Sequence, residues 1–126
     1  MDVKHWTVCL IEPNKFEAQI IVDLLRSAGV VKIKSFASSA DALEVLEVYN
    51  ANVIIASHEM GESDGAAWTR TFRRNSELVC RKAAIFVTAS AFSREMAEDY
   101  RHAGANALIG KPVSGKVLLA TINKVL

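Results

Sequence analysis

Five short apolar runs, each followed by a segment with helical spacing, constrain the fold of this chain more than any other feature. The runs span residues 7–11, 31–36, 52–57, 83–89 and 107–110. Strands that alternate with helices are typical of a parallel sheet with helices on both faces. Because crossover connections are right-handed, few topologies remain. We therefore predict one doubly wound (βα)5 domain of the α/β class over residues 1–126.

The intervening segments carry the start, stop and packing signals of helices. Asn14 is placed to cap the first helix, Gly29 to end it, and Ser38 or Ser39 to start the second. Asp64 is placed to cap the third helix and Gly104 to end the fourth. The predicted apolar faces are Phe16, Ile20, Leu24 and Ala28 of the first helix; Ala42, Leu43, Leu46 and Tyr49 of the second; Trp68 and Phe72 of the third; and Phe92, Met96, Tyr100 and Ala103 of the fourth. The final helix lies within 114–126.

Composition excludes several classes of function. Fifteen Lys and Arg against fourteen Asp and Glu give a formal net charge of +1, which argues against strong non-specific binding to nucleic acid or membranes. No apolar run approaches the roughly 20 residues of a spanning helix, and the first residues lack a signal-peptide pattern. Cys9 and Cys80 have no metal-binding spacing, so we expect reduced thiols, a cytoplasmic protein and no metal or other cofactor.

The residues just past each strand are the candidates for function. In parallel α/β sheets, sites collect at the carboxyl ends of the strands, near the point where strand order reverses. Those positions carry Glu12-Pro13-Asn14, Ser57-His58-Glu59, Thr88-Ala89 and Lys111-Pro112.

These strand ends resemble the receiver domain of bacterial two-component response regulators. The resemblance covers nearly the whole chain and rests on the MGESDG loop at 60–65, on Thr88 and on AGANALIGKP at 103–112. It implies a flavodoxin-like fold with strand order 2-1-3-4-5. It also implies a cis peptide bond between Lys111 and Pro112.

The resemblance further implies a phosphorylation site, and this chain lacks parts of it. Working receivers bind Mg²⁺ between an acidic pair after the first strand and an acceptor aspartate after the third, because the metal neutralises the incoming phosphate. Glu12 matches the first acid, Pro13 replaces the second, Ser57 replaces the acceptor, Thr88 and Lys111 match the phosphate-binding residues, and Leu108 replaces the switching aromatic residue. A neutral hydroxyl cannot form an acyl phosphate and is a poor nucleophile without a base.

We therefore interpret the chain as a degenerate receiver without enzyme activity. Ser57 is expected to be an inert residue of the site, with Lys111 paired to Glu12. A Ser57–His58 catalytic dyad is disfavoured because adjacent strand residues point to opposite faces. Arg70, Arg73, Arg74, Arg81 and Lys82 are expected to be a solvated basic stretch.

The predicted function is phosphorylation-independent signalling through a protein partner. The resemblance places the partner on the face formed by the fourth helix, fifth strand and fifth helix, where Arg94, Glu98, Arg101, Leu108 and Lys116 are candidate contacts. No direct contact with nucleic acid is expected.

Two alternatives remain open. One is a receiver controlled by a small-molecule ligand or by modification of another residue. The other is a flavodoxin-type cofactor binder, although EPNKFEA at 12–18 lacks the Gly, Ser and Thr of a phosphate-binding loop.

Overall fold

A computed structural model of the chain describes residues 2–60 and 64–126. Within these residues, five parallel strands form one sheet in the order β2-β1-β3-β4-β5. The strands are β1 (Thr7–Ile11), β2 (Lys32–Phe36), β3 (Val53–Ser57), β4 (Ala84–Ala89) and β5 (Ala107–Gly110). The predicted order and α/β class are confirmed, and each predicted strand agrees with the structure to within one residue.

Each strand is followed by a helix that begins at a side-chain cap. A short 3-10 turn, η1 (Val3–His5), precedes β1; the helices are α1 (Lys15–Ser27), α2 (Ser39–Leu46), α3 (Gly65–Arg74), α4 (Arg94–Ala103) and α5 (Gly115–Val125). Their N-caps are Asn14, Ser38, Asp64, Ser93 and Ser114, and each cap side chain accepts a hydrogen bond from a first-turn N–H. Gly29 and Gly104 follow α1 and α4 with φ of 100° and 110°, as their predicted role in ending helices requires. In the described part of the chain, no helix is long and apolar enough to cross a membrane.

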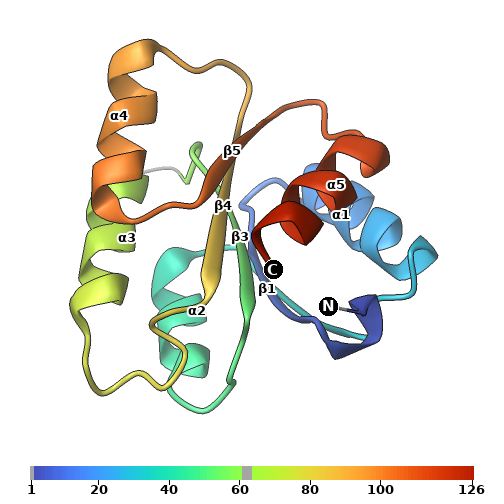
Figure 1. Ribbon diagram of the computed structural model, residues 1–126, viewed down its shortest axis with the longest axis horizontal. Helices are drawn as coiled ribbons and strands as arrows, with labels where there is room; N and C mark the ends of the chain where they lie inside the picture. The colour runs from blue at the N-terminus through green and yellow to red at the C-terminus, as the bar shows by residue number, and fades with distance from the viewer. Residues whose placement is uncertain (1, 61–63) are drawn as a thin grey trace.

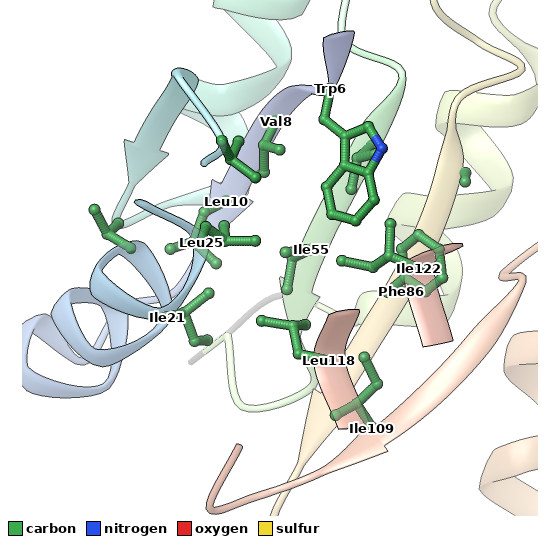
Figure 2. Packing of buried hydrophobic residues seen from close by; sticks show 14 of the residues in the cluster. Trp6, Val8, Leu10, Ile21, Leu25, Ile55, Phe86, Ile109, Leu118 and Ile122 are labelled. Carbon is green, nitrogen blue, oxygen red and sulfur yellow. The ribbon is translucent and has the colours of Figure 1, made fainter. Parts of the chain in front are cut away.

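The sheet is covered on both faces, which produces two separate cores. Figure 1 shows α1 and α5 on one side of the sheet and α2, α3 and α4 on the other. Leu10, Ile55 and Phe86 point toward α1 and α5, where Ile21 and Ile122 meet them (Figure 2). The alternate strand residues line the second core, together with buried side chains of α2, α3 and α4: Cys9, Ile54, Ile85, Leu46, Phe72 and Tyr100.

The apolar face predicted for α1 is wrong at Phe16 and Ile20, although Leu24 does pack against the first core and Ala28 caps the end of the helix. Phe16 is 76% exposed and Ile20 is 39% exposed, whereas the buried residues of the helix are Ala18, Ile21, Val22 and Leu25. A strict four-residue spacing turns by about 40° around the helix at each step. The buried set instead combines steps of three and four, which keeps it on one side.

Two other predicted helix residues lie outside helices. Tyr49 follows the end of α2, and Phe92 precedes the cap of α4. Both side chains still pack partly against the second core, and the Tyr49 hydroxyl donates to the Val8 carbonyl at 3.0 Å. Of the predicted MGESDG loop, residues 61–63 lie outside the described residues.

Arg73 is a structural clamp, which corrects its expected place in a solvated basic stretch. Its Nε and Nη2 donate to the Gly104 carbonyl at 3.1 and 2.8 Å, and its Nη1 donates to the Arg81 and Ala83 carbonyls at 2.7 and 2.6 Å. Nη2 also donates to Asn106 Oδ1 at 3.0 Å. Partial burial lowers the pKa of the guanidinium. Arg73 therefore joins the end of α3 to the segments that lead into β4 and β5.

Candidate functional site

The carboxyl ends of four strands bring together the side chains that the sequence singled out. Glu12 follows β1, Ser57 ends β3, Thr88 lies near the end of β4, and Lys111 follows β5. Ser57 and Thr88 face each other as register partners of β3 and β4. Glu12, Ser57 and Thr88 are buried. The peptide bond between Lys111 and Pro112 is cis, as the resemblance implied.

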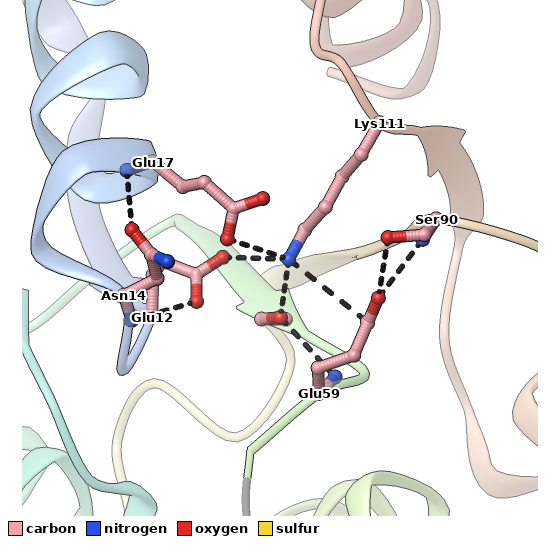
Figure 3. Close-up of polar contacts among 7 residues, drawn as sticks. Glu12, Asn14, Glu17, Glu59, Ser90 and Lys111 are labelled. Carbon is pink, nitrogen blue, oxygen red and sulfur yellow. Dashed lines mark hydrogen bonds and ion pairs between the residues drawn. The ribbon is translucent and has the colours of Figure 1, made fainter.

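The Lys111 ammonium lies at the centre of this site. Its Nζ is 2.8 Å from Glu12 Oε1 in an ion pair that confirms the predicted one, and it donates to Ser57 Oγ at 2.9 Å. Figure 3 shows two further carboxylates that face the same ammonium: Glu17 Oε2 at 3.4 Å and Glu59 Oε2 at 3.9 Å. The side chains of Lys111 and Glu12 are only 7% and 2% exposed, so this ion pair is shielded from water, whereas Glu17 and Glu59 are partly exposed.

The protonation state of Lys111 follows from its partners. Burial lowers the pKa of the amine, but the hydrogen bond and charge of Glu12, followed by the charges of Glu59 and Glu17, outweigh burial and raise the pKa above its usual value. Lys111 is therefore a cation at neutral pH, and it is the donor in its bond to Ser57. An ammonium cannot take a proton from a hydroxyl, so this arrangement does not activate Ser57 as a nucleophile.

Glu12 also shapes the start of α1. Its Oε2 accepts the Asn14 N–H at 3.1 Å, and Asn14 Oδ1 in turn caps the helix by accepting the Glu17 N–H at 3.0 Å. Pro13 between them offers no ligand atom in its side chain. Glu12 is thus fixed by the turn that follows β1 and by Lys111.

Glu59 joins the site to the loop after β4. Its Oε1 accepts both the Ser90 N–H at 3.0 Å and the Ser90 hydroxyl at 2.9 Å. The Glu59 N–H donates to Ser57 Oγ at 3.2 Å. Burial raises the pKa of the Glu59 carboxyl, but the Ser90 hydrogen bonds and the Lys111 charge outweigh burial and lower the pKa below its usual value. Glu59 is therefore an anion at neutral pH.

His58 points away from the site, as expected for the residue next to Ser57. Its Nδ1 lies 2.6 Å from the hydroxyl of Tyr100 on α4, and the two rings meet edge-on with centroids 5.6 Å apart. Burial, and then the charges of Asp64 and Glu59, raise the pKa of Tyr100 to about 12, so the phenol stays neutral. The structure does not form a Ser57–His58 dyad.

The side chains present do not fit the Mg²⁺ ion that the resemblance associates with this position. Magnesium binds several oxygen ligands in near-octahedral geometry. Here the anionic Glu12 faces an ammonium at 2.8 Å, while Pro13 and Ser57 contribute no anionic oxygen. Among the described residues, no group of three or more His, Cys, Asp or Glu side chains is arranged to hold a metal ion.

Most of the predicted partner residues line one groove. Arg94, Glu98 and Arg101 of α4 and Leu108 of β5 border a groove of about 290 Å³. Arg94 Nε and Glu98 Oε1 form an exposed ion pair at 3.5 Å. Lys116 is exposed on α5 and is not among the residues that line this groove.

The sequence did not predict Glu17 or a second groove, and it gave Glu59 only as one of the candidate residues that follow the strands, without a role. Glu17 lies in the first turn of α1 and Glu59 two residues past β3, and only the length of their side chains brings them to Lys111. The second groove, of about 340 Å³, has mostly apolar walls that include Phe16, Ile20 and Val113, with Glu17 and Lys111 at its edge. The exposed aromatic ring of Phe16 marks the position of this second groove.

Solved structures of receiver domains share this fold. The chemotaxis response regulator CheY4 of Vibrio cholerae is 21% identical with a TM-score of 0.85, and the match covers 96% of this chain and 98% of that one. The receiver domain of a DNA-binding response regulator (merR) from Colwellia psychrerythraea is 20% identical with a TM-score of 0.85, over 95% and 97% of the two chains. A CheY-like receiver protein from Methanospirillum hungatei is 17% identical with a TM-score of 0.84, over 95% and 92%.

Family membership comes from a match along the sequence. A search of curated proteins found no match. The family model of the response regulator receiver domain matches residues 8–123, which include Glu12, Ser57, Thr88 and Lys111. The chain therefore belongs to the response regulator receiver domain family.

Proposed function

We propose that this receiver domain is a signalling module that works without aspartyl phosphorylation. The observation that carries the proposal is the contact of Ser57 with Lys111: at the acceptor position, a neutral hydroxyl accepts a hydrogen bond from an ammonium group. An acyl phosphate cannot form on a hydroxyl, and no base activates Ser57 within the described site. The proposed module acts in the bacterial cytoplasm and has no enzyme activity, by analogy with the family to which the chain belongs.

The proposed output is contact with a protein partner through α4, β5 and α5. The groove between α4 and β5 offers apolar walls, including Ala97 and Leu108, with Arg94, Glu98 and Arg101 at its edges. Lys116 extends the same face onto α5. The buried charges of the site are already paired within the chain. In this proposal the face therefore adopts its binding conformation without a phosphoryl group, and partner binding is constitutive.

The first prediction concerns phosphorylation. The wild-type domain should incorporate no label from acetyl phosphate in Mg²⁺, and its amide NMR shifts at Ser57, Thr88 and Lys111 should not move on addition of Mg²⁺ with beryllofluoride. The Pro13→Asp/Ser57→Asp double variant is the positive control, because its added anionic oxygens should make Mg²⁺ binding measurable. Acid-labile label on the wild-type domain would show that a carboxylate still accepts phosphate and would refute the proposal.

The second prediction concerns the face. A partner retained by the immobilised domain, once purified, should bind Arg101→Glu at least about tenfold more weakly, since reversing an interface charge should cost at least about 1.4 kcal/mol. Arg26→Glu is the matched control, because Arg26 is an exposed arginine on α1 in the opposite helical layer. Isothermal titration measures both affinities. Equal affinities of the two variants would place the interface elsewhere.

A second candidate function is regulation by a small molecule in the groove beside α1. Its volume of about 340 Å³ lies at the lower end of the range of ligand sites. The mostly apolar walls and the charged edge suit a ligand with an apolar body and a polar end. Binding of a small-molecule fragment that shifts the amide NMR signals of Phe16, Ile20 and Val113 would favour regulation by a ligand over constitutive binding of a protein partner.

A further inference from the structure

Three consecutive residues, from the last residue of β3 onward, bind three different parts of the molecule. Ser57 Oγ accepts from Lys111 after β5, His58 Nδ1 meets Tyr100 of α4, and Glu59 Oε1 accepts from Ser90 in the loop between β4 and α4. This segment therefore reaches α4 by two routes, through His58 to Tyr100 and through Glu59 to the loop before the helix. Neither route requires a bound ligand.

The Glu59 carboxylate uses its two oxygens differently. Oε1 accepts two hydrogen bonds from Ser90, and Oε2 faces the Lys111 ammonium at 3.9 Å. Hydrogen bonds to an ionised acceptor are stronger than those between neutral groups. Glu59 is thus an anion, covalently part of the chain, that bridges the cation after β5 and the donors after β4 (Figure 3).

The loop that Glu59 holds leads directly into the partner face. Ser90 is three residues before Ser93, which caps α4 by accepting the Met96 N–H at 3.0 Å. Arg94, the next residue, lines the groove between α4 and β5. Tyr100, two turns further along α4, is held by His58. The start of α4 and its buried side are therefore both tied to the segment 57–59.

We propose that Glu59 is a positioning residue that holds the β4–α4 loop against the site and so fixes the start of α4 without phosphorylation. The inference rests on the proposed function, because it explains how the partner face keeps its form when no phosphoryl group can be added. In the working receivers that the chain resembles, an added phosphoryl group would meet a lysine after β5 and a hydroxyl after β4. Here the Glu59 carboxylate contacts the matching lysine, Lys111, and the hydroxyl of Ser90, two residues past the matching Thr88.

Glu17 provides the matched control. Both carboxylates face Lys111, at 3.4 Å for Glu17 and 3.9 Å for Glu59, and their side chains are 38% and 44% exposed. Glu59 alone of the two is bonded to Ser90 in the described structure. A general loss of negative charge near Lys111 would affect both variants, whereas loss of the loop contact affects only Glu59.

The test is amide hydrogen exchange, measured by NMR on the domain alone. Glu59→Ala should raise the exchange rate of the Ser90 amide by about tenfold, since it loses a charged acceptor, and should shift the amide signals of Arg94 and Glu98. Glu59→Gln keeps an acceptor oxygen without the charge, so its rate should lie between those of wild type and Glu59→Ala. Glu17→Ala should leave the Ser90 rate within about twofold of wild type.

Two results would overturn the inference. One is a Ser90 exchange rate in Glu59→Ala within about twofold of wild type; the other is an equal rise in Glu17→Ala. Because the measurement uses neither a partner nor a phosphodonor, its outcome is independent of the proposed function. Label on the wild-type domain would refute that function and leave the Glu59 contact standing.

Discussion

Replacing Lys111 with methionine should lower the free energy of unfolding by about 3–5 kcal/mol, the usual cost of removing one partner of a buried ion pair. The substitution removes the cation that faces Glu12, Glu17 and Glu59. Glu17 and Glu59 are partly exposed and can turn toward water. Glu12, with a side chain only 2% exposed, cannot, so its unpaired charge accounts for most of the loss.

A double-mutant cycle separates this explanation from a simple packing defect. Lys111→Met/Glu12→Gln removes both charges and should be more stable than Lys111→Met alone, since no uncompensated charge stays buried. Urea unfolding followed by circular dichroism measures the free energies. If the two single losses simply add in the double variant, the Glu12–Lys111 pair is not the source of the effect.

The same pair predicts a loss of stability in alkali. The folded-state pKa of Lys111 is raised above its usual value of 10.5. Its contribution is therefore fully present below about pH 10.5 and is lost as pH rises through the higher folded-state pKa. Lys111→Met should lack this component of the alkaline loss, and urea midpoints between pH 9 and 12 test the difference.

Replacing Arg73 with lysine should lower the free energy of unfolding by about 2–4 kcal/mol, because several partly buried carbonyls lose a charged donor. The guanidinium donates to the carbonyls of Arg81, Ala83 and Gly104 and to Asn106 Oδ1. An ammonium has three donors at one point and cannot reproduce this planar fork. Conservation of charge should therefore not preserve stability.

Arg74→Lys is the control for the clamp. Arg74 is the next residue of α3 and is exposed, so the same chemical change there should alter stability by less than about 0.5 kcal/mol. Urea unfolding of both variants gives the comparison. Equal stabilities would mean that the main-chain contacts of Arg73 contribute nothing in solution.

The sequence pattern was sufficient for the α/β class because strand and helix signals repeat along the whole chain, whereas the strand order was implied by the family resemblance. Topology then placed Glu12, Ser57, Thr88 and Lys111 together, since the carboxyl ends of parallel strands share one edge. The Glu12–Lys111 pair could be predicted for the same reason.

The remaining parts of the site depend on how far individual side chains extend, and the spacing of residues along the sequence does not predict this. Glu59 sits in a loop, and Glu17 approaches Lys111 from the first turn of α1. Phe16 was misassigned because two apolar sets compete on α1. Arg73 looked like one of several arginines at a helix end, and only tertiary structure shows carbonyls converging on it.

The arrangement of the helices adds an electrostatic consequence. Because the strands are parallel and each leads into a helix, the N-termini of α1 to α5 in the described chain all lie toward the edge that carries Lys111. Aligned peptide dipoles place about half a positive charge at each helix N-terminus. The backbone alone therefore favours negative charge at this edge, whichever side chains are present. Three carboxylates face the single ammonium of Lys111, those of Glu12, Glu17 and Glu59. The electric field of the helix dipoles helps to stabilise their excess negative charge, and no single side-chain substitution removes that field.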